Sequence, residues 1–238
     1  IASPHASTGW FTDPAVARRL AREMNEYAAS KLVADHKGRF GLFAALPIPD
    51  VEGSLREIEY AFDTLKADGV SMLTSYDKQW LGDEAFAPIF NELNRRKAIV
   101  YTHPIQSACC PNLLKGVQPQ TLEYITDTGR TIMSLIVSNT ATRCPDVKFI
   151  FSHAGGSLVS MAGRWLGDVL NGDKLAQPAE ANSRLYHLRR FYYDTAQSTS
   201  PVLLQALKML VPASQIVYGT DWPFANPAAP RSACSGPC

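Results

Sequence analysis

Short apolar segments alternate with amphipathic helical patterns along most of this 238-residue chain, and no other property of the sequence restricts its fold as strongly. Strands that are apolar on both faces and separated by crossover helices pair in parallel, either in a doubly wound sheet or in a barrel. The alternation therefore predicts one α/β domain built on a parallel sheet. The predicted strands are residues 40–46, 70–73, 98–101, 147–151, 191–193 and 216–218.

The segments between these strands carry the start signals of helices. Pro14 follows a polar capping residue, and apolar residues then recur every three or four positions until the pattern stops before Gly38. Asp50 and Asp83 each precede another such pattern, where a carboxylate accepts a hydrogen bond from the first free backbone N–H groups. Further helices are predicted at residues 121–142, 156–170, 184–189 and 201–210.

The charge balance excludes two classes of partner. The chain has 23 basic and 22 acidic residues, a formal net charge of +1, so it has no basic field for a nucleic-acid backbone or an anionic membrane surface. Its apolar runs are too short to cross a bilayer. We therefore expect neither a nucleic acid nor a membrane as partner, and a small molecule instead.

The cysteines indicate a reducing compartment. There are five, an odd number without a Cys-x-x-Cys pair, which argues against a disulfide framework. We interpret Cys109 and Cys110, which follow a strand end, as ordinary loop or buried cysteines rather than as a reactive thiol site. No positively charged leader precedes an apolar stretch, so we expect a cytoplasmic protein.

Polar residues gather where four of the predicted strands end. His103 and His153 follow two of these strands, Asp194 ends a third, and Asp221 follows the last. The carboxyl ends of parallel strands meet at one rim, so these side chains are expected to converge there. Two histidines and a carboxylate suit a divalent cation such as zinc, and they equally suit acid–base chemistry near neutral pH. The competing interpretation is that each polar residue merely caps the helix that follows it.

The same strand ends carry a resemblance to a known family. Five segments resemble motifs of the amidohydrolase superfamily. They are Thr102-His103-Pro104, Ser152-His153-Ala154-Gly155-Gly156, Gly219-Thr220-Asp221-Trp222-Pro223-Phe224, Arg39-Phe40 and Ala45-Leu46-Pro47. The similarity is to its branch of aminocarboxymuconate-semialdehyde, resorcylate and methylsalicylate decarboxylases. It implies a (β/α)8 TIM-type barrel, incomplete at the N-terminus. Residues 1–226 would run from the tip of strand two to strand eight, and residues 227–238 would form an irregular tail.

The resemblance also implies roles for the residues at the rim. His103 and Asp221 match two of the family's metal ligands, and His153 matches the histidine beside the metal. His153 and Asp221 are the expected acid–base catalysts. Trp222 and Phe224 would form an apolar wall for a planar ring, with packing beneath the rim as the competing interpretation.

A dimer is implied by one further match. Arg164 corresponds to an arginine that related decarboxylases contribute to a substrate carboxylate across a dimer interface; an exposed surface arginine is the alternative. The apolar residues 131–137 agree with a homodimer formed through the helices after strands five and six.

The expected function is that of a metal-dependent decarboxylase of a small aromatic or muconate-type carboxylic acid. Its cofactor would be a divalent metal, with zinc as the first expectation and manganese or magnesium as alternatives. The family's first-strand metal pair, His-x-His or Glu-x-His, does not occur in the sequence, although His5 is placed to face the pocket. Two other interpretations therefore stay open: a metal-dependent hydrolase of a lactone or amide, and a catalytically inactive truncated fragment.

Overall fold

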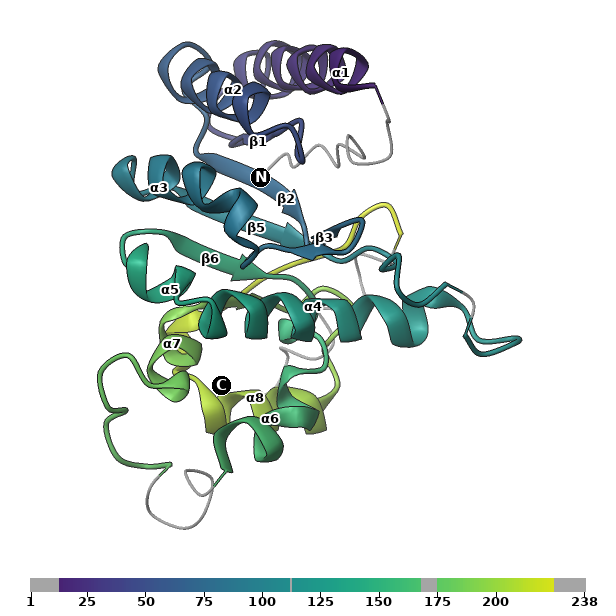
Figure 1. Ribbon diagram of the computed structural model, residues 1–238, viewed down its shortest axis with the longest axis vertical. Helices are drawn as coiled ribbons and strands as arrows, with labels where there is room; N and C mark the ends of the chain where they lie inside the picture. The colour runs from purple at the N-terminus through teal and green to yellow at the C-terminus, as the bar shows by residue number, and fades with distance from the viewer. Residues whose placement is uncertain (1–12, 112, 168–174, 225–238) are drawn as a thin grey trace.

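The computed structural model describes residues 13–111, 113–167 and 175–224 (Figure 1). His5, the predicted strand tip at residues 1–4 and the predicted tail at 227–238 lie outside the described residues, so the predicted domain limits stay a prediction. The elements in chain order are α1 (Pro14–Tyr27), η2 (Ala28–Ala34), β1 (Phe43–Ala45), α2 (Val51–Asp63), β2 (Gly69–Leu73), β3 (Ser75–Tyr76), β4 (Gln79–Trp80), η3 (Glu84–Phe86), α3 (Ala87–Arg95), β5 (Ile99–His103), α4 (Pro119–Val137), α5 (Thr140–Arg143), β6 (Lys148–Phe151), η4 (His153–Gly155), α6 (Leu158–Leu166), α7 (Arg184–Arg190), β7 (Tyr192–Asp194), α8 (Pro201–Leu210), η7 (Ala213–Gln215) and β8 (Ile216–Val217).

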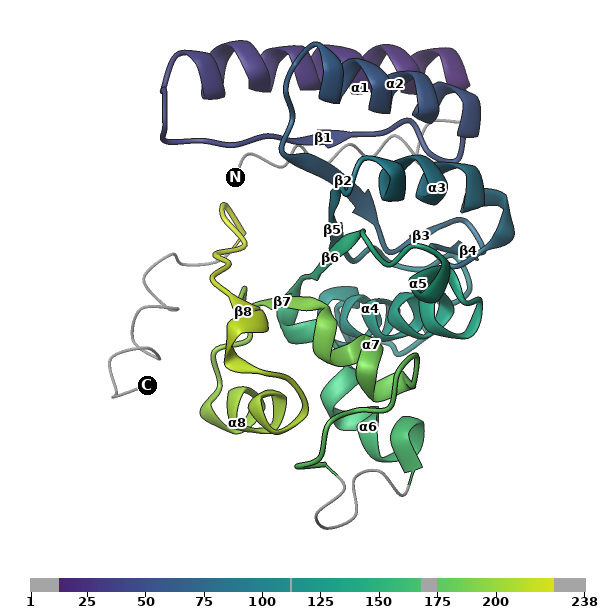
Figure 2. The same ribbon diagram turned by 90° about the vertical axis from the view of Figure 1, so that its left-hand side faces the viewer.

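Six strands form one parallel sheet in the order β1-β2-β5-β6-β7-β8. Each strand lies beside its predecessor in the sheet, whereas a doubly wound sheet reverses direction at a switch point. The strands follow an arc from β1 to β8 with helices on its outer side (Figure 2). The prediction of a parallel α/β fold of the barrel type is confirmed, and within the described residues the sheet is open between β1 and β8.

Strands β1 and β2 are buried at every position, whereas β5 and β6 alternate between buried and more accessible residues. Phe149 and Phe151 on β6 are fully buried and pack against Phe191, with ring centroids 5.5 and 5.2 Å away. Phe90 of α3 covers Phe149 from the outer side, at 5.8 Å between centroids. Burial of such large rings contributes about 1.5–3 kcal/mol each to folding. None of the helices in the described stretches is long and apolar enough to cross a bilayer.

The helix starts were predicted well, and two helix interiors were not. The first helix, predicted to continue to Gly38, ends as an α-helix at Tyr27 and continues as the π-helix η2 to Ala34. Asp13 and Asp50 accept hydrogen bonds from the N–H groups of Ala15 (2.8 Å) and Gly53 (3.0 Å) at the starts of α1 and α2. The helix predicted over residues 121–142 is interrupted, because Asn139 adopts a left-handed backbone with a φ of 59° between α4 and α5. Asparagine tolerates this conformation better than most residues, so a single residue is enough to turn the chain.

Strand β1 ends the sheet within the described residues, and a side chain of α1 holds it. The buried Asn25 amide donates to the Ala45 carbonyl (2.9 Å) and accepts from the Ala45 N–H (2.7 Å). The same Asn25 nitrogen also donates to the carboxylate of Glu57 on α2, at 2.8 Å. One amide therefore connects the strand to both helices that cover it.

A short hairpin that the sequence analysis missed lies between β2 and α3. It is formed by β3 and β4 and is bound to α4 by the buried carboxylate of Asp127. This carboxylate accepts hydrogen bonds from the Thr74 hydroxyl (2.6 Å), the Ser75 hydroxyl (2.8 Å) and the indole N–H of Trp80 (2.8 Å). A buried charge requires this number of donors, and the three bonds fix the hairpin on the helix.

The cysteine interpretation was wrong at one pair. Cys109 and Cys110, which we interpreted as ordinary loop or buried cysteines, are joined as a vicinal disulfide. The two residues are adjacent in the chain, and their Cα atoms are 3.8 Å apart. Cys144 is buried and free.

Acid should destabilise the fold through His187. This buried ring on α7 makes a 3.1 Å contact from its Nε2 to the Thr142 hydroxyl, and desolvation, with the nearby charge of Arg190, lowers its pKa. The unfolded chain therefore takes up a proton near pH 6.5 while the folded chain does so only at lower pH, so stability falls as the pH drops below about 6.5. His187→Phe should reduce the loss of stability between pH 7.5 and pH 5.5, measured as the change in the urea concentration at the midpoint of unfolding. Equal shifts in both proteins would show that His187 is not responsible.

Candidate metal and catalytic site

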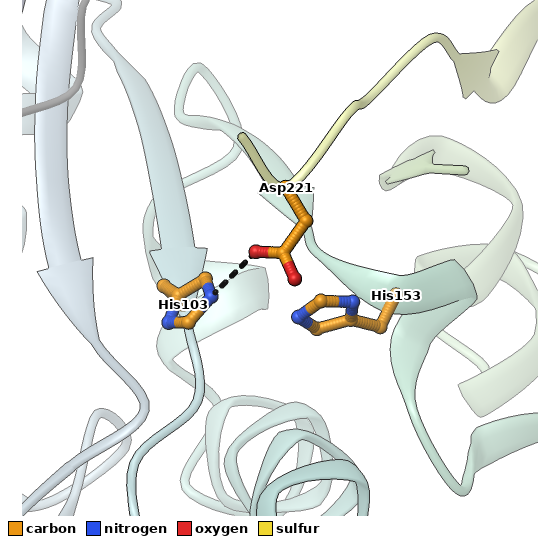
Figure 3. Close-up of side chains that lie close together, drawn as sticks. All are labelled: His103, His153 and Asp221. Carbon is orange, nitrogen blue, oxygen red and sulfur yellow. Dashed lines mark ion pairs between the residues drawn. The ribbon is translucent and has the colours of Figure 1, made fainter. Parts of the chain in front are cut away.

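The structure brings His103, His153 and Asp221 together at the carboxyl rim of the sheet. Their side chains point toward one another from the ends of β5 and β6 and from the segment after β8 (Figure 3). His103 Nε2 lies 3.5 Å from Asp221 Oδ1, and the two imidazole centroids are 5.3 Å apart. One ligand atom from each residue lies within 4.8 Å of the others. Residues separated by long stretches of sequence thus meet because parallel strands end at one rim.

Local backbone geometry places each of these side chains. His103 is the last residue of β5, where its carbonyl accepts a hydrogen bond from the Thr74 N–H at 3.0 Å. His153 and Asp221 both have a φ of 55°, in the left-handed region that costs a residue with a side chain about 1–3 kcal/mol. Such conformations persist only where surrounding contacts hold them, and they gather at functional sites.

Both imidazoles are oriented by backbone carbonyls. Nδ1 of His103 lies 3.0 Å from the Pro104 oxygen, and Nδ1 of His153 lies 2.9 Å from the Ala196 oxygen. Since a carbonyl oxygen only accepts, each Nδ1 carries a proton, and Nε2 is the ring nitrogen left for the site. Histidines that ligate metals are usually oriented through such a bond from the other ring nitrogen.

Asp221 is held as a carboxylate. Its side chain is only 9% exposed, and Gln197 donates a hydrogen bond from Nε2 to Oδ2. Burial alone would raise the pKa of Asp221, but hydrogen bonds from His103 and Gln197 outweigh burial and lower it below its usual value. The sequence analysis missed Gln197, because a glutamine three residues beyond a strand carries no signal of its own.

The three residues fit a divalent cation. Two imidazole nitrogens and one carboxylate oxygen are ligands that zinc and similar borderline ions prefer. Ligand atoms around one ion with bonds of about 2.1 Å are roughly 3–4 Å apart. The observed separations, up to 4.8 Å, reach that spacing after small side-chain rotations.

The predicted substrate contacts lie away from the packed interior. Trp222 and Phe224 are 72% and 76% exposed, so neither ring packs beneath the rim. Arg164 is exposed on α6. Their roles toward a substrate stay predictions.

Gly156, just after His153, should not tolerate a side chain. Its φ is +62°, and a Cβ there would lie 2.2 Å from the Ile125 carbonyl oxygen of α4. Gly156→Ala should destabilise the protein by about 2–4 kcal/mol, from backbone strain plus displacement of the loop from α4. The measurement is a denaturant titration. Gly116→Ala is the matched control, because Gly116 has a φ of +84° with nothing within 4 Å; equal losses in both variants would exclude the contact with α4 as the cause.

A singly wound parallel sheet with two histidines and an aspartate at its carboxyl rim is typical of the α/β-barrel enzymes that use a divalent cation. The family model described as Amidohydrolase (Amidohydro_2) matches residues 1–236, and the chain belongs to this family.

Similar proteins are named as decarboxylases. Decarboxylase yanB of Aspergillus niger is 39% identical over 224 residues, which cover 89% of this chain and 60% of yanB. The 6-methylsalicylic acid decarboxylase of Penicillium expansum is 36% identical, covering 90% of this chain and 66% of that protein. The chain thus spans less than two thirds of the length of these relatives. Among solved structures, 2,6-dihydroxybenzoate decarboxylase complexed with 2,6-dihydroxybenzoate shares the fold, with a TM-score of 0.80 at 21% identity over 96% of this chain and 74% of that chain.

Proposed function

We propose that this chain carries the site of a metal-dependent carboxy-lyase that decarboxylates a small aromatic or muconate-type carboxylic acid. The observation that supports this proposal is the convergence of His103, His153 and Asp221 at one rim. The chain belongs to the amidohydrolase family, and the relatives to which it is similar are named as decarboxylases. His103 and Asp221 hold the cation, and His153 and Asp221 are the acid–base groups.

The protein's own residues account for the proton. His153 delivers a proton to the ring carbon that bears the carboxylate; the carbon–carbon bond then breaks, carbon dioxide leaves, and the bonding electron pair returns to the ring. Its Nδ1 proton stays on the Ala196 carbonyl, so Nε2 is the atom that takes up a proton from solvent before the step and gives it to the ring carbon. Asp221, whose pKa is lowered, stays ionised and serves as the base of the pair. When bound, the cation supplies Lewis-acid stabilisation of negative charge on the substrate.

Zinc is our proposal for the cation, because an imidazole and a carboxylate, those of His103 and Asp221, suit a borderline ion. A solved neighbour, a dihydroxybenzoic acid decarboxylase from Polaromonas with a TM-score of 0.81 at 22% identity, contains manganese. Elemental analysis of protein purified without added metal should find zinc. Manganese or magnesium in its place would overturn the assignment of zinc and leave the ligands unchanged.

The activity is tested by measuring carbon dioxide released from 6-methylsalicylate, 2,6-dihydroxybenzoate and 5-carboxyvanillate. At least one should be decarboxylated, and His153→Asn should slow that reaction by about 10²–10⁴-fold. His36→Asn, which changes an exposed histidine, is the control and should have no effect. Hydrolysis of lactone or amide substrates without carbon dioxide release would support a hydrolase instead. A folded protein that turns over neither class would support an inactive fragment.

We further propose a homodimer formed through α4 and α6. Of the apolar residues 131–137 that we expected at the interface, Ile132, Leu135 and Ile136 are buried in the subunit core and only Val137 is exposed. Leu122 of α4 and Met161 of α6 are the other large apolar side chains exposed on these two helices, and Arg164 lies exposed on α6. Light scattering should give twice the mass of the chain, and a monomer at micromolar concentration would overturn the proposal. A cytoplasmic location is proposed as well, to be tested by cell fractionation.

A further inference from the structure

Asp194, at the end of β7, lies buried beneath the site and binds groups from β5, from His153 after β6, and from its own turn. Its Oδ1 accepts hydrogen bonds from the backbone N–H groups of His153 (2.8 Å) and Ala196 (3.0 Å). Its Oδ2 accepts from the Tyr101 hydroxyl of β5 at 3.1 Å. Only 4% of the residue is exposed, so these bonds act without competition from solvent.

One carboxylate oxygen thus controls both ends of the contact that orients the His153 ring. It holds the N–H of His153, whose left-handed backbone needs an external contact to persist. It also holds the N–H of Ala196, the residue whose carbonyl receives the His153 Nδ1 proton at 2.9 Å. The position of the ring and the nitrogen that bears its proton therefore depend on the same acceptor.

The turn that begins at Asp194 also reaches Asp221. Gln197 donates to the Asp221 carboxylate, and the Thr195 hydroxyl accepts from the Gly219 N–H at 3.3 Å. Gly219 passes so close that a Cβ on it would lie 2.7 Å from Cγ of Asp194. The segment carrying Asp221 is therefore packed directly on the Asp194 side chain.

We propose that Asp194 is a positioning residue that aligns His153 and Asp221 through the turn 194–197, fixing His153 in the tautomer with its proton on Nδ1. This inference rests on the proposed function in one respect, namely that His153 and Asp221 belong to the same site. It gives Asp194 a role beyond ending its strand.

The first test is the ¹⁵N chemical shifts of His153 in the metal-free protein, with the zinc affinity of the same samples. Wild type should show the Nδ1–H tautomer alone. Asp194→Ala should show a mixture of tautomers and a loss of about 10–100-fold in zinc affinity, the range found when an outer-shell partner is removed. Asp194→Asn keeps an oxygen for both N–H groups and should restore the single tautomer and most of the affinity. A single tautomer and wild-type affinity in a folded Asp194→Ala protein would overturn the proposal, as would an Asn variant as impaired as Ala.

A second variant keeps the test decisive if Asp194→Ala does not fold. Gly219→Ala retains the carboxylate but displaces it, and should produce the same mixture of tautomers. Tyr101→Phe removes only the third hydrogen bond to Asp194 and should leave the His153 tautomer unchanged. A mixture of His153 tautomers in Tyr101→Phe would overturn the role proposed for Asp194. A single tautomer in Gly219→Ala would overturn it as well. Neither readout needs turnover. An inactive wild type with tautomers that respond as described would therefore contradict the proposed function alone.

Discussion

Asp221→Asn should remove tight metal binding and decarboxylation together. The substitution keeps the size of the side chain but exchanges an anionic oxygen for a neutral amide, so both the charge that attracts a cation and the base of the pair are lost. We expect zinc affinity to fall by about 100-fold or more and the rate of decarboxylation by about 10³-fold. Isothermal titration with zinc and single-turnover release of carbon dioxide measure the two effects separately.

Asp77→Asn is the matched control for this experiment. Asp77 is exposed, lies in the β3–β4 hairpin and shares the left-handed backbone of Asp221, with a φ of 55° in both residues. The control should therefore reproduce any effect of the backbone without touching the site. Full zinc affinity in Asp221→Asn would show that the metal ligands are elsewhere.

Asp127→Ala should cause the largest loss of stability. The substitution removes the acceptor of the buried Thr74 and Ser75 hydroxyls and of the half-buried Trp80 indole N–H. Buried donors without partners cost about 1–3 kcal/mol each, so the variant should lose about 3–6 kcal/mol. For a domain of this size that corresponds to a fall in melting temperature of about 10 °C or more, measurable by calorimetry.

Asp146→Ala is the control for that loss, because Asp146 is an exposed aspartate and surface substitutions change stability by about 0.5 kcal/mol or less. A comparable melting temperature in the two variants would mean that the hairpin does not depend on Asp127. If the hairpin detaches without global unfolding, fluorescence of Trp80 should change before the main transition.

Features that depend on neighbouring residues were predictable from the sequence. The strands were found because both of their faces are apolar, and the caps at Asp13 and Asp50 because a carboxylate and the N–H groups it accepts from are close in the chain. The convergence of His103, His153 and Asp221 followed from one topological rule, that parallel strands end at a common rim.

Features that depend on distant partners were not predictable in this way. Asp127 meets the Thr74 hydroxyl across 53 residues, and no periodicity records that contact. Gln197 reaches Asp221 across 24 residues, and its position is set by how two strand-end turns pack. The break at Asn139 was missed for a different reason, because both flanking segments have helical patterns and a single φ of 59° separates them.

The amide of Asn25 has a consequence for how the protein avoids aggregation. An exposed edge strand offers its N–H and C=O groups to any other extended chain, and sheets that grow by such addition are a common route to insoluble assemblies. On β1 the outward groups of Ala45 are already bound by the Asn25 side chain, which imitates one residue of a neighbouring strand. A foreign strand can align with this edge only by displacing that amide, which would leave the buried Glu57 carboxylate short of a donor. Within the described residues, one side chain of α1 thus makes this end of the sheet a poor template.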